Sequence, residues 1–198
     1  MTAVRPTYAE LAARRGLGAK LAAAGAATGG IVGWQIGWQP VLGAWLVLVV
    51  VGVVLGYIDA QTRLLPTQII APSYALIAIL LVLAAAVDSD WSRLWHAVIG
   101  WGVMGGFYFL MWFIYPKGLG YGDVRLSGLL GPCLAYLGWG ELATGLYAGF
   151  LLGGVGGGLL ALLRVVDRKR YPFGPFMLLG ALAGLIWGGP FADWYTGH

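Results

Sequence analysis

Long apolar runs separated by short polar breaks dominate this chain. Seven stretches approach the roughly 20 mainly apolar residues that an α-helix needs to cross a bilayer. They are residues 17–37, 41–58, 67–87, 94–115, 126–138, 142–163 and 173–191. The fifth is short, so it either forms a span of its own or is fused with the sixth. The pattern predicts an all-α, polytopic membrane bundle with seven spans.

The seven stretches suggest three parts along the chain. Residues 1–40 would form an N-terminal cytoplasmic segment and one extra membrane helix, and residues 41–191 a core of six helices. Residues 192–198 would form a short extracytoplasmic tail.

Composition supports membrane embedding and excludes several classes of protein. The chain is 60% hydrophobic and 10% charged, with a mean hydropathy of +0.81, which is too apolar for a soluble domain. The apolar run from Leu17 leads into further runs without a convincing cleavage site, which argues against a signal peptide. Cys133 is the one cysteine, so we expect a small buried side chain and no zinc cluster.

The basic residues are distributed asymmetrically. The formal net charge is +4, but the charges follow the breaks between apolar runs, as topology demands, and do not suggest nucleic-acid binding. Of the 12 basic residues, all but Arg93 fall on one side, which predicts a cytoplasmic N-terminus and an extracytoplasmic C-terminus. Tryptophans near the predicted outer ends agree with this topology: Trp34, Trp38, Trp45, Trp91, Trp95, Trp139, Trp187 and Trp194.

Two acidic residues stand at membrane boundaries on the predicted cytoplasmic side. Asp59 follows an apolar run directly, where an acid is costly unless it is paired or functional. It could simply pair with Arg63 four positions on. Asp123 precedes an apolar run and could cap that helix by accepting backbone N–H bonds. Each acid alone has an ordinary structural explanation.

Together the two acids suggest chemistry, because the predicted topology allows them to meet. Two close carboxylates share a proton, and the ionised one can take a proton from water while the protonated one polarises a peptide carbonyl. Gly120 and Gly122 flank the second acid and can adopt positive φ, which would admit a substrate backbone. They could equally form a tight turn. The glycine-rich residues 153–158 predict close helix packing or, alternatively, a pliable helix.

Three motifs resemble those of the type IV prepilin peptidase family, within the GxGD class of membrane aspartyl proteases. The first runs from Asp59 through Leu65-Pro66, and the second is Lys117-Gly118-Leu119-Gly120-Tyr121-Gly122-Asp123-Val124-Arg125. The third is Tyr171-Pro172-Phe173-Gly174-Pro175-Phe176. The three patterns occur in order and all on one predicted side of the membrane.

The resemblance implies an aspartic endopeptidase with Asp59 and Asp123 as its catalytic pair. It would remove the basic leader of pilin-like precursors on the cytoplasmic side of a prokaryotic inner membrane. The motifs suggest further residues that shape the site or bind substrate: Pro66, Lys117, Gly120, Tyr121, Gly122, Arg125, Gly174 and Pro175.

We expect no cofactor or metal, and we expect membrane lipids and a prepilin or pseudopilin precursor as partners, but no nucleic acid. Many relatives carry a four-cysteine zinc domain linked to N-methylation, and a chain with Cys133 alone cannot form that site. We therefore expect peptidase activity without methyl transfer. Two alternatives remain, namely a small transporter that uses both acids as a proton relay and another GxGD protease.

Overall fold

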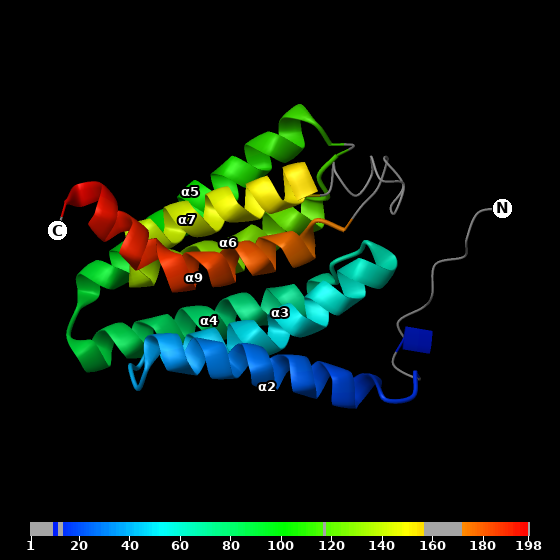
Figure 1. Ribbon diagram of the computed structural model, residues 1–198, viewed down its shortest axis with the longest axis horizontal. Helices are drawn as coiled ribbons and strands as arrows, with labels where there is room; N and C mark the ends of the chain where they lie inside the picture. Colours follow the sequence, from blue (N-terminus) through cyan, green and yellow to red (C-terminus); the bar gives the residue numbers. More distant parts are fainter. Residues whose placement is uncertain (1–9, 12–13, 117, 157–171, 198) are drawn as a thin grey trace.

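The protein is a bundle of antiparallel helices (Figure 1). The computed structural model describes residues 10–11, 14–116, 118–156 and 172–197. The long helices of this part are α2 (Leu17–Ile36), α3 (Leu42–Thr62), α4 (Thr67–Asp88), α5 (Trp91–Ile114), α6 (Tyr121–Leu137), α7 (Trp139–Leu151) and α9 (Gly174–Thr196). A π-helical turn, η1 (Leu152–Gly156), continues α7. The described residues include no strand, so the all-α prediction is confirmed.

The observed helices follow the predicted apolar stretches closely. The fifth and sixth stretches form separate helices, because the chain turns at Gly138 between α6 and α7. α5 begins three residues earlier than predicted, where the carboxylate of Asp90 accepts the backbone N–H of Ser92 at 3.1 Å and caps the helix. The end of the sixth predicted span lies outside the described residues.

Four helices in the described part are long and apolar enough to cross a membrane: Leu42–Thr62, Thr67–Asp88, Trp91–Ile114 and Gly174–Thr196. α6, with 17 residues, and α7, with 13, are shorter than a full span. Large apolar side chains such as Phe113 point outward, as expected for contact with lipid. The molecule is therefore a membrane helical bundle, while the number of seven crossings stays a prediction.

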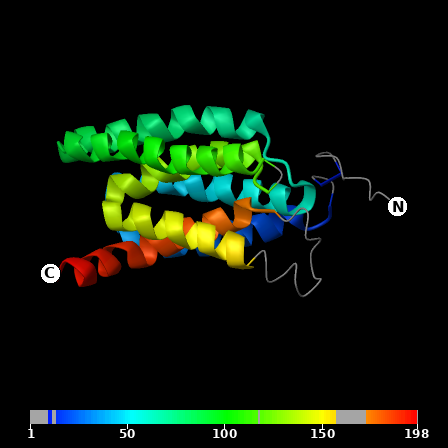
Figure 2. The same ribbon diagram turned by 90° about the horizontal axis from the view of Figure 1, so that it is seen from above.

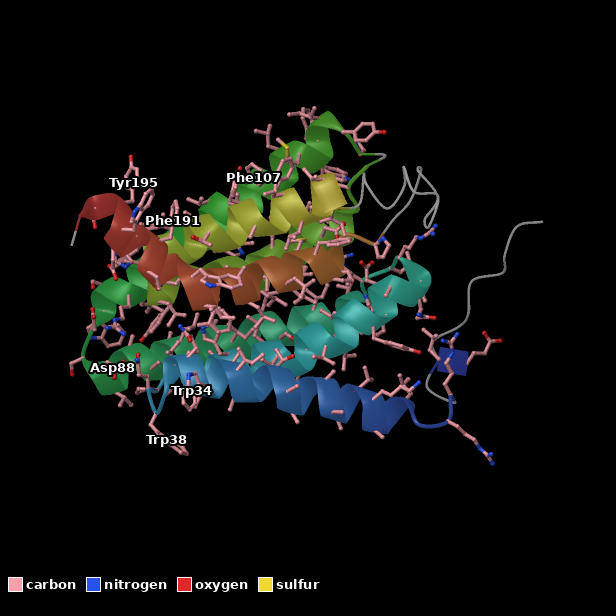
Figure 3. The ribbon with its side chains drawn as sticks, viewed as in Figure 1. Trp34, Trp38, Asp88, Phe107, Phe191 and Tyr195 are labelled. Carbon is pink, nitrogen blue, oxygen red and sulfur yellow. The ribbon has the colours of Figure 1, made fainter. Side chains whose placement is uncertain are left out.

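The bundle has two distinct ends (Figures 1 and 2). At one end α3 finishes and α4, α6 and α9 begin. The other end carries Trp34, Trp38, Asp88 and Tyr195 (Figure 3). Trp34 and Trp38 are fully or almost fully exposed there, as expected for interfacial indoles. Trp45 is buried in the core instead, because it packs between helices.

α7 and α9 pack through glycines. A Cβ added to Gly180 would lie 2.4 Å from the Cα of Gly149, and one added to Gly184 would lie 2.8 Å from the Cα of Gly145. Small residues spaced four apart let two helix backbones approach in this way. In the glycine-rich segment, Gly153 lies against the ring of Phe173. This contact supports close packing at Gly153, whereas nothing lies within 4 Å of a Cβ added to Gly154. Residues 157–158 of the segment lie outside the described residues.

Candidate active site

The last turn of α3 places Asp59 inside the bundle. The side chain is 4% exposed, and its Oδ2 accepts a hydrogen bond from the backbone N–H of Gly174 at 3.0 Å. Arg63 acts on this carboxyl group as a nearby positive charge. The direct partner of Asp59 Oδ2 is therefore the start of α9, and not the residue four positions on in its own helix.

A short loop leads from α3 into α4 beside Asp59. Arg63 ends α3 in the left-handed region, with φ 57° and ψ 34°. The hydroxyl of Thr62 donates to the carbonyl of Ile58 at 2.8 Å and accepts the N–H of Leu64 at 3.2 Å. These bonds satisfy backbone groups at the helix end. After this turn, Leu65 and Pro66 line the same cavity as Asp59.

Asp123 is the third residue of α6 and is also buried, with 6% of its surface exposed. Its Oδ2 accepts the N–H of Gly120 at 3.0 Å. This bond closes the first turn of the helix, so the capping role considered from the sequence is present. The other oxygen, Oδ1, is buried and has no hydrogen-bond partner among the described protein atoms. Capping therefore occupies only one side of this carboxyl group.

Asp59 and Asp123 line the same cavity. Its volume is about 380 Å³, and its walls come from the α3–α4 loop and the start of α6. The charge of Asp59 acts directly on Asp123. Two buried carboxyl groups within electrostatic reach in one cavity can share a proton and handle a water molecule between them.

Gly122 sets the distance between the two walls of this cavity. A Cβ added to it would lie 2.9 Å from the Cβ of Leu65, so only glycine allows this approach. Neither Gly120 nor Gly122 is among the described residues with positive φ, and Gly120 is extended, with φ −77° and ψ 146°. The expectation of positive φ is wrong, because close packing and not backbone conformation requires glycine here.

Arg125 and Tyr121 form the outer rim of the cavity. The Arg125 guanidinium lies 5.6 Å from the centre of the Tyr121 ring, within range of a cation–π interaction. It also donates a hydrogen bond to the hydroxyl of Thr67 at the start of α4. Arg125 therefore ties α6 to α4 beside the acids, a role that the sequence did not reveal because Thr67 belongs to no recognised motif.

The remaining residues suggested by the motifs divide between two places. Pro66 lines the cavity of the two acids and precedes α4. Gly174 contributes its N–H to Asp59. Pro175, one residue further, lines a different cavity. Lys117 lies outside the described residues.

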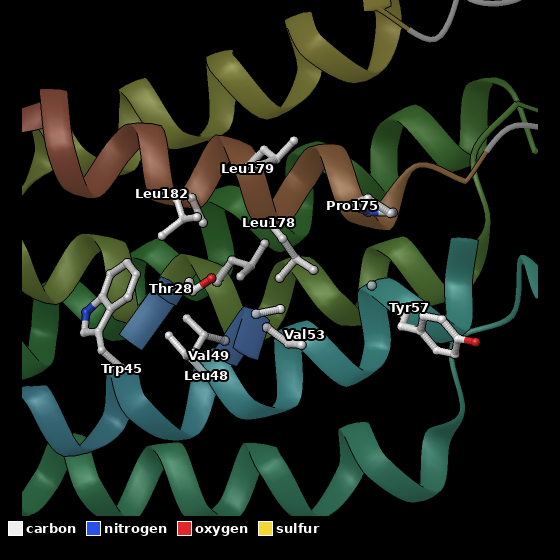
Figure 4. A pocket seen from close by; sticks show the side chains of 15 residues that line it. Thr28, Trp45, Leu48, Val49, Val53, Tyr57, Pro175, Leu178, Leu179 and Leu182 are labelled. Atoms are coloured by element: carbon white, nitrogen blue, oxygen red, sulfur yellow. The ribbon is translucent and has the colours of Figure 1, made fainter. Parts of the chain in front are cut away.

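That second cavity lies between α2, α3 and α9 (Figure 4). It has a volume of about 340 Å³, and its lining is almost entirely apolar, with residues such as Leu48, Val53 and Leu178. Among the described residues, no acidic side chain lines it. Acid–base chemistry therefore belongs to the cavity of Asp59 and Asp123.

Other sequence expectations concern residues away from this site. Cys133 is buried, as expected for a small apolar side chain. His96 packs against Trp139, with ring centroids 4.9 Å apart. In the described part of the chain, no three His, Cys, Asp or Glu side chains gather in a way that suits a metal ion.

Comparison with known proteins gives a consistent result. The model of the type IV leader peptidase family matches residues 46–189. A prepilin leader peptidase/N-methyltransferase of Aeromonas salmonicida is 34% identical over 161 residues, which are 77% of this chain and 52% of that protein. The Aeromonas hydrophila protein of the same name has the same identity and coverage. That of Pseudomonas aeruginosa is 31% identical over 150 residues, 74% of this chain and 50% of the relative.

The chain thus spans about half the length of these curated relatives. No solved structure matches it.

Proposed function

The chain belongs to the type IV leader peptidase family, and we propose that it is a membrane aspartic endopeptidase that removes the leader peptide of prepilin-like precursors. The names of its relatives support this activity and substrate class. The observation that carries the proposal is the cavity that Asp59 and Asp123 share at one end of the bundle.

The two acids would hydrolyse a peptide bond with one water molecule. The ionised carboxylate takes a proton from water, and the water oxygen attacks the carbonyl carbon. The protonated carboxyl group donates its proton to the carbonyl oxygen, which gives a neutral tetrahedral intermediate. When the C–N bond breaks, the carboxyl group that took the proton from water gives it to the leaving nitrogen. A hydroxyl group of the intermediate returns its proton to the other carboxylate, so the pair again holds one proton.

The hydrogen bonds around the acids are compatible with one carboxyl group that acts on water and one that acts on the carbonyl oxygen. Gly174 and Gly120 each donate one backbone N–H to one oxygen of Asp59 and Asp123, respectively. Fixed N–H donors hold each carboxyl group in one orientation and leave its second oxygen for other partners. The cavity lies where the bundle ends, so an extended peptide segment can reach the acids while its own membrane helix stays in the bilayer.

We further propose that this end of the bundle faces the cytoplasm and that the C-terminus lies on the other side. The basic residues of the described part support this orientation, because Arg14, Lys20, Arg63 and Arg125 belong to the end that holds the acids, whereas Arg93 follows the opposite turn. In this orientation the acids meet the leader on the side where the precursor is made. The membrane would be the inner membrane of a prokaryote.

Methyl transfer is named for the relatives, but we expect this chain to cleave without methylating. Its 198 residues contain a single cysteine, so they cannot supply four thiolate ligands to zinc. Intact mass distinguishes the two outcomes, since a methylated product is heavier than the cleaved product by one CH₂ group.

The proposal is tested by co-expressing the chain with a set of candidate pilin and pseudopilin precursors and measuring their intact masses. Loss of the leader, at one peptide bond and only when the chain is present, is the expected result. If no precursor is cleaved, but the chain carries protons or solutes across the membrane of vesicles, then the acids serve transport instead. The position of both acids at one end of the bundle, away from its middle, favours the protease.

A further inference from the structure

A buried hydroxyl group near the acids has no evident structural purpose. Tyr108 of α5 is 0% exposed, and its hydroxyl has no hydrogen-bond partner among the described protein atoms. Burial of such a group costs free energy, and phenylalanine would fill the same space without this cost. The hydroxyl therefore calls for a functional explanation.

The packing of Tyr108 places its ring beside the residue that precedes α9. Its ring meets that of Phe173 edge to face, with centroids 6.0 Å apart. Phe173 directly precedes Gly174, which holds Asp59. The hydroxyl oxygen lies 3.3 Å from the position that a Cβ of Gly149 would occupy, so this glycine of α7 leaves room for it.

The hydroxyl also lies within electrostatic reach of Asp123. The Oδ1 atom of that carboxyl group is also buried and has no hydrogen-bond partner among the described protein atoms. A phenol donates one hydrogen bond and a carboxylate oxygen accepts one. The two unpartnered atoms, one on α5 and one on α6, are thus complementary as donor and acceptor.

We propose that Tyr108 is a positioning residue for Asp123, whose Oδ1 accepts a hydrogen bond from the Tyr108 hydroxyl, directly or through one water molecule, in the working enzyme. The inference rests on the proposed function for its kinetic consequence. With Gly120 on Oδ2 and Tyr108 on Oδ1, the rotation of the carboxyl group is fixed from both sides. This orientation matters in the step in which Asp123 exchanges a proton with water or with the carbonyl oxygen.

The chain contains a matched control. Tyr136 of α6 is equally buried, and its hydroxyl also lacks a partner among the described protein atoms. The charged groups that act on it are Asp88, Arg93 and Asp90, which belong to the opposite end of the bundle. Tyr108→Phe and Tyr136→Phe therefore remove the same atom from similar surroundings, near the acids in one case and far from them in the other.

The first test measures kcat and KM for precursor cleavage by the parent and both variants in proteoliposomes, together with the melting temperature. Tyr108→Phe is expected to lower kcat by about tenfold, as for one lost hydrogen bond in the transition state, with KM and the melting temperature maintained. Tyr136→Phe should keep both kinetic constants. Equal kcat values for the two variants overturn the assignment of Tyr108.

A second readout does not depend on cleavage. The infrared C=O stretch of the protonated Asp123 carboxyl group, assigned by its loss in Asp123→Asn, should move to higher wavenumber in Tyr108→Phe and stay in place in Tyr136→Phe. If this shift occurs in a protein that cleaves no precursor, the proposed function fails and the role of Tyr108 stands. If Tyr108→Phe cleaves normally and the C=O stretch does not shift, the role of Tyr108 fails and the proposed function stands.

Discussion

The backbone N–H of Gly174 donates a hydrogen bond to Oδ2 of Asp59 across 3.0 Å, although the two residues are 115 positions apart. This bond joins the end of α3 to the start of α9. The third sequence motif therefore supplies a backbone N–H group to a buried carboxyl group. The main chain must come close to Asp59 at this point. A Cβ at position 174 would lie 2.9 Å from the same Oδ2 atom.

Gly174→Ala should therefore damage the site more than the fold. The added methyl group must displace the Asp59 carboxyl group or the start of α9, at a cost of about 1–3 kcal/mol in the free energy of unfolding. A displacement of this kind misaligns a reacting group, so we expect kcat for precursor cleavage to fall by about 100-fold.

Gly102→Ala is the control for this change. Gly102 lies in α5, and nothing lies within 4 Å of the position of an added Cβ. Its melting temperature and cleavage rate should match those of the parent. If Gly174→Ala cleaves as fast as Gly102→Ala, the Gly174 amide does not position Asp59.

Gly122→Ala tests the approach of the two cavity walls. The new methyl group would lie 2.9 Å from the Cβ of Leu65, so the α3–α4 loop must move away from α6 and carry Asp59 away from Asp123. We expect a loss of cleavage together with a cost of about 1–3 kcal/mol in stability, measured by precursor turnover and by chemical denaturation.

Gly43→Ala is the comparison here, since its added Cβ would make an ordinary contact with Leu80 at 3.8 Å. Parent-like turnover by Gly122→Ala would show that the separation of the two walls does not limit the reaction.

Asp90 provides a prediction about pH at the opposite end of the bundle. The hydroxyl of Ser92 donates a hydrogen bond to the Asp90 carboxylate. This hydrogen bond is the main reason why the pKa of Asp90 lies below its ordinary value of 3.8. A lowered folded-state pKa stabilises the fold fully above the unfolded-state pKa, and this contribution disappears as pH falls through the folded-state value. Asp90→Ala should therefore melt below the parent at pH 7, and the difference should shrink at about pH 3. A difference that stays constant across this range would contradict the ionised cap.

Much of the fold could be predicted from the sequence, because lipid imposes a simple requirement on helix length and polarity. The positions of α3, α4 and α9 followed from apolar runs and polar breaks. The separation of α6 from α7 did not follow, since Gly138 breaks the helix within an apolar region and composition does not report such a turn. The burial of Trp45 was missed for a similar reason, because it depends on neighbouring helices.

The candidate site, too, could be predicted from the sequence only in part. Asp59 and Asp123 could be recognised from the sequence, because acids at membrane boundaries are unusual. Their hydrogen-bond partners could not be predicted, because backbone N–H groups carry no sequence signature. The contact between Arg125 and Thr67 and the position of Tyr108 depend on how helices far apart in the chain pack together.

The proposed pairing of Asp59 and Asp123 in catalysis is tested by the rate of precursor cleavage in proteoliposomes. The purified variants are Asp59→Asn and Asp123→Asn, with Asp88→Asn as the control. Asparagine keeps the shape of the side chain but cannot exchange the proton. Each single variant should lose at least about 1,000-fold in kcat, whereas Asp88→Asn should match the parent, since Asp88 is exposed at the opposite end. Parent-like cleavage by either Asp59→Asn or Asp123→Asn would show that the two acids are not a catalytic pair.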